Sequence, residues 1–380
     1  MDFELTKSQK LFQQMIREFA EKEVKPIAAE VDDEEKFPTE NVKKLGKLGV
    51  LGIPTPKVYG GAGGDHIMYT VAIEELSRVC ATTGVIVSAH TSLCEDAILD
   101  NGTEEQKQKY LPKLASGEWI GAFGLTEPNA GTDASAQQTM AVEDGDDYIL
   151  NGTKIFITNA GEADVYVIAT MTDKSKGNKG ITTFIVEATT PGFSIGKKEH
   201  KMGIRGSATC ELIFENCRVP KANMLGKLGG GFAVAMKTLD GGRIGIAAQA
   251  LGIAQGAMDE TVKYCKERKQ FGKSLSQFQN TQFQLADLQT KIEASRYLVR
   301  AAAWKKDHGM PFSADAAMAK LFAAETAMEM TTKAVQFHGG YGYTREYPVE
   351  RMMRDAKITE IYEGTSEVQR MVIAGKLFKK

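Results

Sequence analysis

The sequence has little that would suit a membrane, a nucleic acid or an export signal. No apolar run among its 380 residues approaches the ~20 residues that cross a bilayer, so we expect no membrane span. The formal net charge is only −2, which argues against nucleic acid as an electrostatic partner. The first residues, MDFELT, are acidic and amphipathic, unlike a signal peptide.

Cysteine and histidine are scarce, with five of each. Because the cysteines are scattered, odd in number and without a CxxC pair, disulfide and metal-binding roles are disfavoured. The pattern fits a reducing cytoplasm. The histidines are scattered too, and we expect no metal site. His338, beside a glycine-rich turn, is expected to be structural or to line the edge of a cofactor.

Two signatures of nucleotide-binding folds are also missing. The glycine-rich stretch 52–64 is expected to be a loop between helices, because no Lys-Ser/Thr pair follows its glycines as in a phosphate loop. Strand and helix patterns do not alternate, which disfavours a doubly wound fold.

The spacing of apolar residues, by contrast, is informative, and it changes twice along the chain. Residues 1–120 carry apolar side chains at helical spacing, with Thr6 as a plausible N-cap, and predict an N-terminal helical domain. Residues 121–228 contain short β-branched and aromatic runs separated by turn signals. They predict a central antiparallel β-sandwich or barrel.

The third region, residues 229–380, predicts a C-terminal four-helix bundle. Long helical stretches at 232–268, 278–308 and 313–337 are joined by short connections, and residues 365–378 complete the bundle. The predicted fold class is therefore α+β.

Near the C-terminus, Glu363 is a candidate general base. Ile358, Ile361 and Tyr362 before it are expected to form one wall of a buried pocket, and Gly364 after it allows a ligand close approach. Thr365 or Ser366 can cap the following helix. Burial among apolar groups raises the pKa of a carboxyl group toward the range useful for a base. A lone glutamate is nevertheless more often a solvated surface residue.

Five further segments could carry chemistry, although each has an ordinary structural explanation. They are a strand entering a polar turn at 123–135, a strand end at 154–159, a glycine-rich helical stretch at 239–245, a basic helix end at 267–273, and a glycine-rich helix terminus at 336–342. Taken singly, these are as easily a hairpin turn, a strand core, a helix contact, a solvated helix end and a helix cap.

Together, in this order and followed by Ile-Tyr-Glu-Gly-Thr at 361–365, these segments resemble the acyl-CoA dehydrogenase family. The resemblance covers essentially the whole chain. The stretch 238–252 is similar to the short-chain, butyryl-CoA branch from anaerobic bacteria.

The resemblance implies roles for individual residues. Glu363 matches the family's catalytic base; some relatives carry the base at the position of Gly242, where glycine cannot serve. The residues implied to contact FAD are Phe123, Leu125, Thr126, Gly131, Thr132, Phe156, Ile157, Thr158, Arg268, Gln270, Phe271, Phe278, Gln279, Gln336, Gly339, Gly340, Thr365 and Glu367. Those implied to contact the acyl-CoA are Thr132, Asp240, Arg243, Gln249, Thr359, Tyr362 and Gly364. Phe156 stands where the family usually has Trp, so ring packing there is expected to differ slightly.

The implied activity is α,β-dehydrogenation of a short-chain acyl-CoA, or the reverse reduction. Glu363 removes the α-proton, and hydride passes from the β-carbon to flavin N5. Gln249 and Thr359 match the pair that closes the short-chain pocket, which implies a preference for C4 to C6 chains. An electron-transfer flavoprotein is the implied electron partner, and a homotetramer is implied because a neighbouring subunit supplies part of the FAD site. The alternatives are an acyl-CoA oxidase and a non-catalytic CoA- or flavin-binding protein of the same fold.

Overall fold

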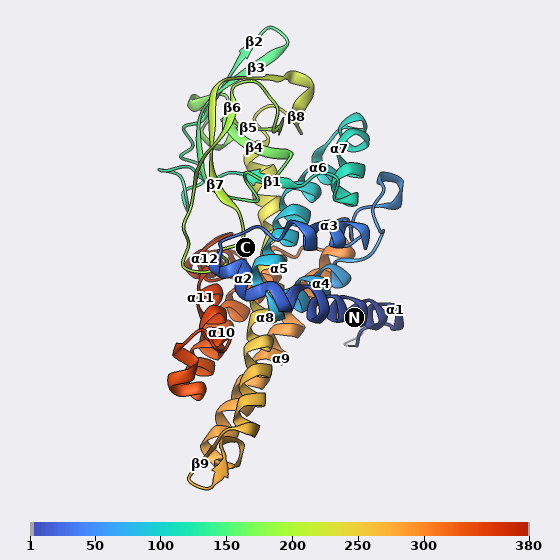
Figure 1. Ribbon diagram of the computed structural model, residues 1–380. Coiled ribbons are helices and arrows are strands. Elements are labelled where there is room, and N and C mark those ends of the chain that lie inside the picture. Colours follow the sequence, from blue (N-terminus) through green and yellow to red (C-terminus); the bar gives the residue numbers. More distant parts are fainter. Residues whose placement is uncertain (1–3, 379–380) are drawn as a thin grey trace.

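The computed structural model describes residues 4–378 and begins with a layer of helices (Figure 1). Thr6 caps the first helix as predicted: its hydroxyl accepts from the Gln9 N–H, and the Gln9 side chain accepts from the Thr6 N–H. The helices are α1 (Lys7–Phe19), α2 (Ala28–Asp33), α3 (Thr39–Lys47), α4 (His66–Val79), α5 (Ala81–Ser88), α6 (Asp96–Asn101) and α7 (Glu104–Ser116), with a π-helical segment, η4 (Ala89–Glu95), between α5 and α6.

The middle of the chain forms an eight-stranded sheet with the order β6-β7-β3-β2-β4-β5-β8, and β1 pairs with β4. The strands are β1 (Gly121–Gly124), β2 (Met140–Asp144), β3 (Asp147–Thr158), β4 (Val165–Met171), β5 (Ile181–Glu187), β6 (Phe193–Lys198), β7 (Thr209–Pro220) and β8 (Met224–Leu225). Most pairs are antiparallel, but β1 runs parallel to β4, so the sheet is mixed. This refines the predicted antiparallel arrangement, since hairpin signals report only neighbours in sequence.

The C-terminal helices form the predicted bundle, with α10 packed against α8, α9 and α12. The elements are α8 (Gly231–Glu267), a two-stranded ribbon of β9 (Lys269–Gln270) and β10 (Lys273–Ser274), α9 (Gln279–Asp307), α10 (Ser313–His338), α11 (Val349–Ile358) and α12 (Ser366–Leu377). Of the two caps predicted for the last helix, Thr365 is the one used, accepting from the Val368 N–H.

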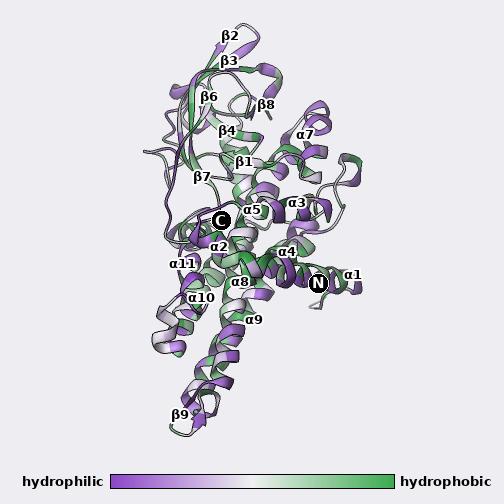
Figure 2. Cartoon of the chain, in the orientation of Figure 1, coloured by the Kyte–Doolittle hydropathy of each residue, from purple (hydrophilic) through white to green (hydrophobic). Residues whose placement is uncertain are grey.

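Helix α8 lies at the centre, because α4 and α5 of the first region also pack on it. Its residues from Gly241 to Ala254 are all buried, which an alanine- and glycine-rich sequence permits by letting helices approach closely. Hydrophobic residues are accordingly concentrated in central elements such as the middle of α8, whereas the tip with β9 is mostly hydrophilic (Figure 2). No helix within residues 4–378 is long and apolar enough to cross a membrane.

The α+β fold class is confirmed. Secondary structure changes from helix to strand between Ser116 and Gly121, and back to helix between Leu225 and Gly231. The predicted domain boundaries at residues 120 and 228 stay a prediction, because a change of secondary structure does not by itself define an independent unit.

Candidate active site

A cavity of about 640 Å³ lies between the sheet, the start of α8 and the segment that carries Glu363. The sheet contributes Phe123, Phe156 and Thr158, and α8 contributes Phe232 and Leu239 among others. Ile358, Ile361 and Tyr362 line it as predicted. The walls are mostly apolar, so a ligand bound here would be shielded from water.

Glu363 lies on a left-handed turn of the backbone in this cavity, with φ +52°, followed by Gly364 with φ +92°. Its Oε2 is buried and has no hydrogen-bond partner among the described residues. Burial raises the pKa of this carboxyl group to about 7, against the opposing charges of Lys320 and Arg243. A carboxylate with that pKa and a free oxygen is suited to accept a proton near neutral pH.

The glycines of α8 make room for this arrangement. A Cβ on Gly242 would stand 2.1 Å from Glu363 Oε2, and one on Gly245 would stand 2.3 Å from the hydroxyl of Tyr69. Since real Cβ atoms do not approach that closely, the glycine-rich stretch serves close approach of polar side chains to the helix.

The sheet wall of the cavity is shaped by an irregularity in β3. The pairing of β3 with β7 shifts register between Lys154 and Ile157, and Phe156 adopts φ +58°. The bulge turns the Phe156 ring outward, leaving it 60% exposed at the cavity edge. The Ile155 N–H donates to the Thr126 carbonyl, which ties the bulge to the polar turn after β1.

A buried ion pair supports that polar turn from behind. Lys154 Nζ lies 2.6 Å from Glu127 Oε1 and also donates to the Leu125 carbonyl. The Glu127 carboxylate accepts from the backbone N–H groups of Gln138 and Thr139. Burial works to raise the pKa of Glu127, but the Lys154 charge and these donors hold it below its usual value. The ends of the turn are therefore fixed although its tip is exposed.

Thirteen of the residues implied by the resemblance line this one cavity: Phe123, Leu125, Thr126, Gly131, Thr132, Phe156, Ile157, Thr158, Arg243, Tyr362, Glu363, Gly364 and Thr365. Asp240 is not part of this lining, but it forms an ion pair with Arg243, which is. Glu367 is exposed on the first turn of α12, outside the lining.

Gln249 and Thr359 are fully buried and do not line the cavity. The Tyr362 hydroxyl is hydrogen bonded to Gln249 Oε1, and the Gln249 amide donates to the Ala81 carbonyl. Tyr362 therefore covers Gln249. Gln249 can therefore act on a ligand only through Tyr362 or after movement of Tyr362.

The remaining implied cofactor residues lie away from Glu363, beyond or beside the ends of α8, α9 and α10. They are Arg268, Gln270, Phe271, Phe278, Gln279, Gln336, Gly339 and Gly340, and none lines the cavity. The ribbon with β9 is at the far tip of the bundle (Figure 1). Phe271 on its turn is 94% exposed. His338 nearby is buried and stacked on Tyr264, so its place is structural.

Sequence reasoning missed several contributors. Phe232 and Met236 line the cavity from the first turns of α8, and their helical spacing was a usable signal. Leu93, Lys320 and Gln369 come from other helices and had no local signature. In the described residues no group of His, Cys, Asp or Glu could hold a metal ion.

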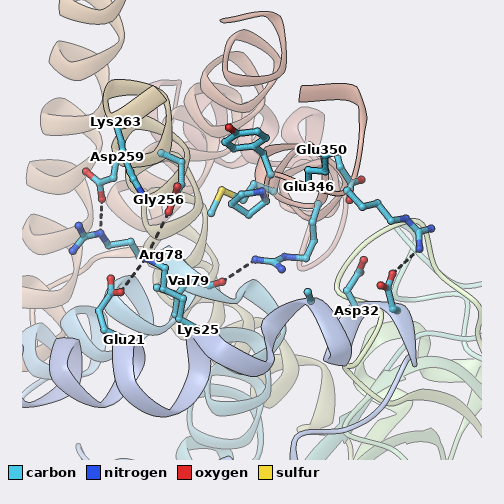
Figure 3. Close-up of a pocket in the computed structure, with 18 residues that line it drawn as sticks. Glu21, Lys25, Asp32, Arg78, Val79, Gly256, Asp259, Lys263, Glu346 and Glu350 are labelled. Atoms are coloured by element: carbon cyan, nitrogen blue, oxygen red, sulfur yellow. Dashed lines mark hydrogen bonds and ion pairs between the residues drawn. The ribbon is translucent and has the colours of Figure 1, made fainter. Parts of the chain in front are cut away.

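A second cavity, of about 450 Å³, lies where α8, α4 and the early helices meet the segment before α11 (Figure 3). Its charges largely neutralise one another: Arg78 pairs with Asp259, and Lys25 with Glu21 and Glu260. This cavity is a network of ion pairs, whereas the cavity at Glu363 combines an apolar wall with an unpartnered carboxylate oxygen. The latter is therefore the candidate active site.

The fold agrees with the comparisons with known proteins. Family models match along the chain: acyl-CoA dehydrogenase N-terminal domain at residues 6–118, middle domain at 122–217 and C-terminal domain at 229–378. The chain belongs to the acyl-CoA dehydrogenase family.

Individual relatives match over their whole length. The chain is 66% identical to a short-chain specific acyl-CoA dehydrogenase of Clostridium acetobutylicum, covering 100% of both. It superimposes on the butyryl-CoA dehydrogenase of Megasphaera elsdenii with a TM-score of 0.98, at 54% identity and 100% coverage of both chains. It also matches, with a TM-score of 0.99, 58% identity and 100% coverage of both chains, a solved structure described as "Electron transferring flavoprotein of Acidaminococcus fermentans: Towards a mechanism of flavin-based electron bifurcation".

Proposed function

We propose that this protein is an FAD-dependent short-chain acyl-CoA dehydrogenase, acting on butyryl-CoA or, in reverse, on crotonyl-CoA. The observation that carries the proposal is Glu363: a carboxylate whose Oε2 is buried and unpartnered among the described residues, in a largely apolar cavity of about 640 Å³. The similarity to short-chain and butyryl-CoA dehydrogenases supports the same activity.

The cavity suits the ring of FAD on its sheet side. The exposed Phe156 ring offers an aromatic edge, and Thr126 and Thr158 offer hydroxyl groups beside it. Bound there, FAD would take up the hydride from the β-carbon of the substrate. The resemblance implies that Arg268, Phe271, Gln336 and their neighbours hold the ADP part of FAD, and none of these residues lines this cavity. We therefore assign them to the site of a second subunit in a homotetramer.

Glu363 takes the α-proton. The α-carbon of a thioester is weakly acidic, so its carbonyl must be polarised by hydrogen-bond donors. The backbone N–H of Glu363 finds no acceptor among residues 4–378 and is free to serve as one such donor. The apolar side chains of the buried Leu93 and the half-buried Phe232 help to exclude water, which keeps the carboxylate basic and strengthens the polarisation.

A short acyl chain fits the closed end of the cavity. Tyr362 covers the buried Gln249, so a longer alkyl chain would meet the Tyr362 hydroxyl and then a buried polar side chain. Burying an alkyl tail against polar groups that lose their partners is unfavourable. We expect C4 to C6 chains to react best.

The electron partner is an electron-transfer flavoprotein, as the resemblance implies. The match to a solved structure described by that name supports this assignment. We place the protein in the cytoplasm, where its five buried free thiols would stay reduced.

The test is anaerobic flavin reduction by butyryl-CoA. We expect the visible flavin absorbance of the wild type to bleach, and Glu363→Gln to keep its FAD but lose most of the reaction, because the amide cannot accept the proton. An unchanged rate of flavin reduction in Glu363→Gln would refute the assignment of Glu363 as the base.

Comparing the rates with C4, C8 and C16 substrates tests the expected chain length, and a C16 optimum would contradict the preference for C4 to C6. Rapid reoxidation by air would indicate an oxidase, and a colourless protein a non-catalytic relative.

A further inference from the structure

The backbone that carries Glu363 adopts an unfavourable conformation. Glu363 has φ +52° and Gly364 has φ +92°, two successive residues in the left-handed region. A residue with a Cβ rarely adopts it, and such a conformation persists only where its surroundings hold it. Something in the structure must therefore hold this turn.

Two side chains from different helices hold it. Lys320 on α10 donates from Nζ to the Gly364 carbonyl at 2.8 Å. Gln369 on α12 donates from Nε2 to the same carbonyl at 2.7 Å and to the Glu363 carbonyl at 3.3 Å. Both side chains are 0% exposed. The turn is thus attached to two helices of the bundle through its own carbonyl groups.

The burial of Lys320 is costly, because an ammonium group loses its hydration and here receives a carbonyl oxygen in exchange. An apolar side chain would be the ordinary occupant of a fully buried position on α10. Retaining a charged group there indicates a role that an apolar side chain cannot fill, namely donation to the turn and a positive charge near the base.

The charged and titratable groups around Glu363 come from four elements. Arg243 faces it from α8 and is paired with Asp240. Lys320 faces it from α10, Tyr69 from α4 and Tyr362 from the preceding residue. Of the two cations, Lys320 is the one that also contacts the backbone of the turn.

We propose that Lys320 and Gln369 are positioning residues that hold the Glu363–Gly364 turn, so that the carboxylate and the Glu363 N–H both face the reacting thioester. The inference rests on the proposed function. Gln369 acts through hydrogen bonds alone, whereas Lys320 also adds charge. The two residues therefore have different signatures.

Lys320→Met and Gln369→Met separate these contributions, since methionine has a similar length and is apolar. The measurement is the rate of anaerobic flavin reduction by butyryl-CoA as a function of pH, in holoenzyme of known FAD content. Both variants should reduce the flavin about 10- to 100-fold more slowly, because small misplacements of a reacting group cost that much. Lys320→Met should also move the acid limb to higher pH, since a cation that favours the carboxylate is lost. Gln369→Met should leave the limb in place.

Lys43→Met and Gln14→Met, exposed residues of the N-terminal helices, are matched controls and should react as the wild type does. Wild-type rates in both test variants would overturn the proposal, as would slowing by Lys320→Met without movement of the acid limb. If Lys320→Met fails to retain FAD, the rate of flavin reduction in Gln369→Met alone decides whether the turn is held as proposed. Absence of bleaching in the wild type would instead refute the proposed function, so the two failures are distinguishable.

Discussion

At the scale of single residues, we expect the ionisation of Glu363 to set the pH dependence of activity. Burial raises the pKa of its carboxyl group to about 7, so the basic form is lost as pH falls through that value. We expect kcat/KM for butyryl-CoA to rise with pH through a limb near 7, because this quantity reports ionisations of the free enzyme. A profile that is flat between about pH 5 and 8 would contradict the assignment of Glu363 as the base.

Gly242 provides a second test at this scale. A Cβ there would stand 2.1 Å from Glu363 Oε2 and 2.7 Å from Leu93 Cδ2, so Gly242→Ala must displace the base. We expect flavin reduction to slow by about 100-fold, the cost of a small misplacement, with FAD retained. Gly375→Ala is the matched control, because a Cβ at that helical position meets nothing within 4 Å. Equal rates in the two variants would show that Gly242 does not set the position of the base.

At the scale of elements, the bulge of β3 and the turn after β1 depend on the buried pair of Lys154 and Glu127. Lys154→Met leaves the Glu127 charge buried without its partner, which should destabilise the protein by about 3–5 kcal/mol and weaken FAD binding. Adding Glu127→Gln should restore part of that stability, since the unpaired charge is removed. Urea denaturation of the single and double variants measures both effects.

The control for this prediction is the exposed pair of Lys221 and Glu143 in the same sheet region. Lys221→Met should cost no more than about 1 kcal/mol, as exposed ion pairs do. A similar small effect for Lys154→Met would mean that the buried pair does not support the turn.

At the scale of the whole molecule, we expect the tip of the bundle to serve both FAD binding and assembly. Phe271 is 94% exposed on a left-handed turn beyond α8, an unusual place for an aromatic ring in an isolated chain. We expect Phe271→Ala to lower both the FAD content and the tetramer fraction seen by analytical ultracentrifugation. Val58→Ala, which alters an exposed residue between α3 and α4, should change neither. Loss of FAD from a tetramer that stays intact would show that Phe271 serves FAD binding but not assembly.

How far the fold follows from the sequence differs between elements. The long helices 231–267, 279–307 and 313–338 were predicted to within a residue or two, because their periodic patterns end at clear Gly, Pro and turn signals. β2 and β6 were missed, and so was the parallel pairing of β1 with β4, since that pairing joins strands distant in the chain. The helix α11 was also missed, because it is short and carries several charges.

The residues of the candidate site also differ in how far the sequence predicts them. Local pattern placed Ile358, Ile361 and Tyr362 beside Glu363 and supplied the Thr365 cap, because these effects act within one or two turns of the chain. Lys320 and Gln369 gave no sequence signal, since a lysine or glutamine in a helix is ordinarily a surface residue. Only the packing of α10 and α12 against the turn shows that both are buried there.

The sequence by itself determined the family, the order of helical and strand regions, and the candidate base, because these depend on composition, local periodicity and short motifs. Tertiary structure alone decided that Gln249 lies behind Tyr362, that Phe271 and its neighbours do not line the cavity at Glu363, and that Lys320 contacts the turn. The reason is physical: burial, pKa and hydrogen-bond partners are set by neighbours that come from distant parts of the chain.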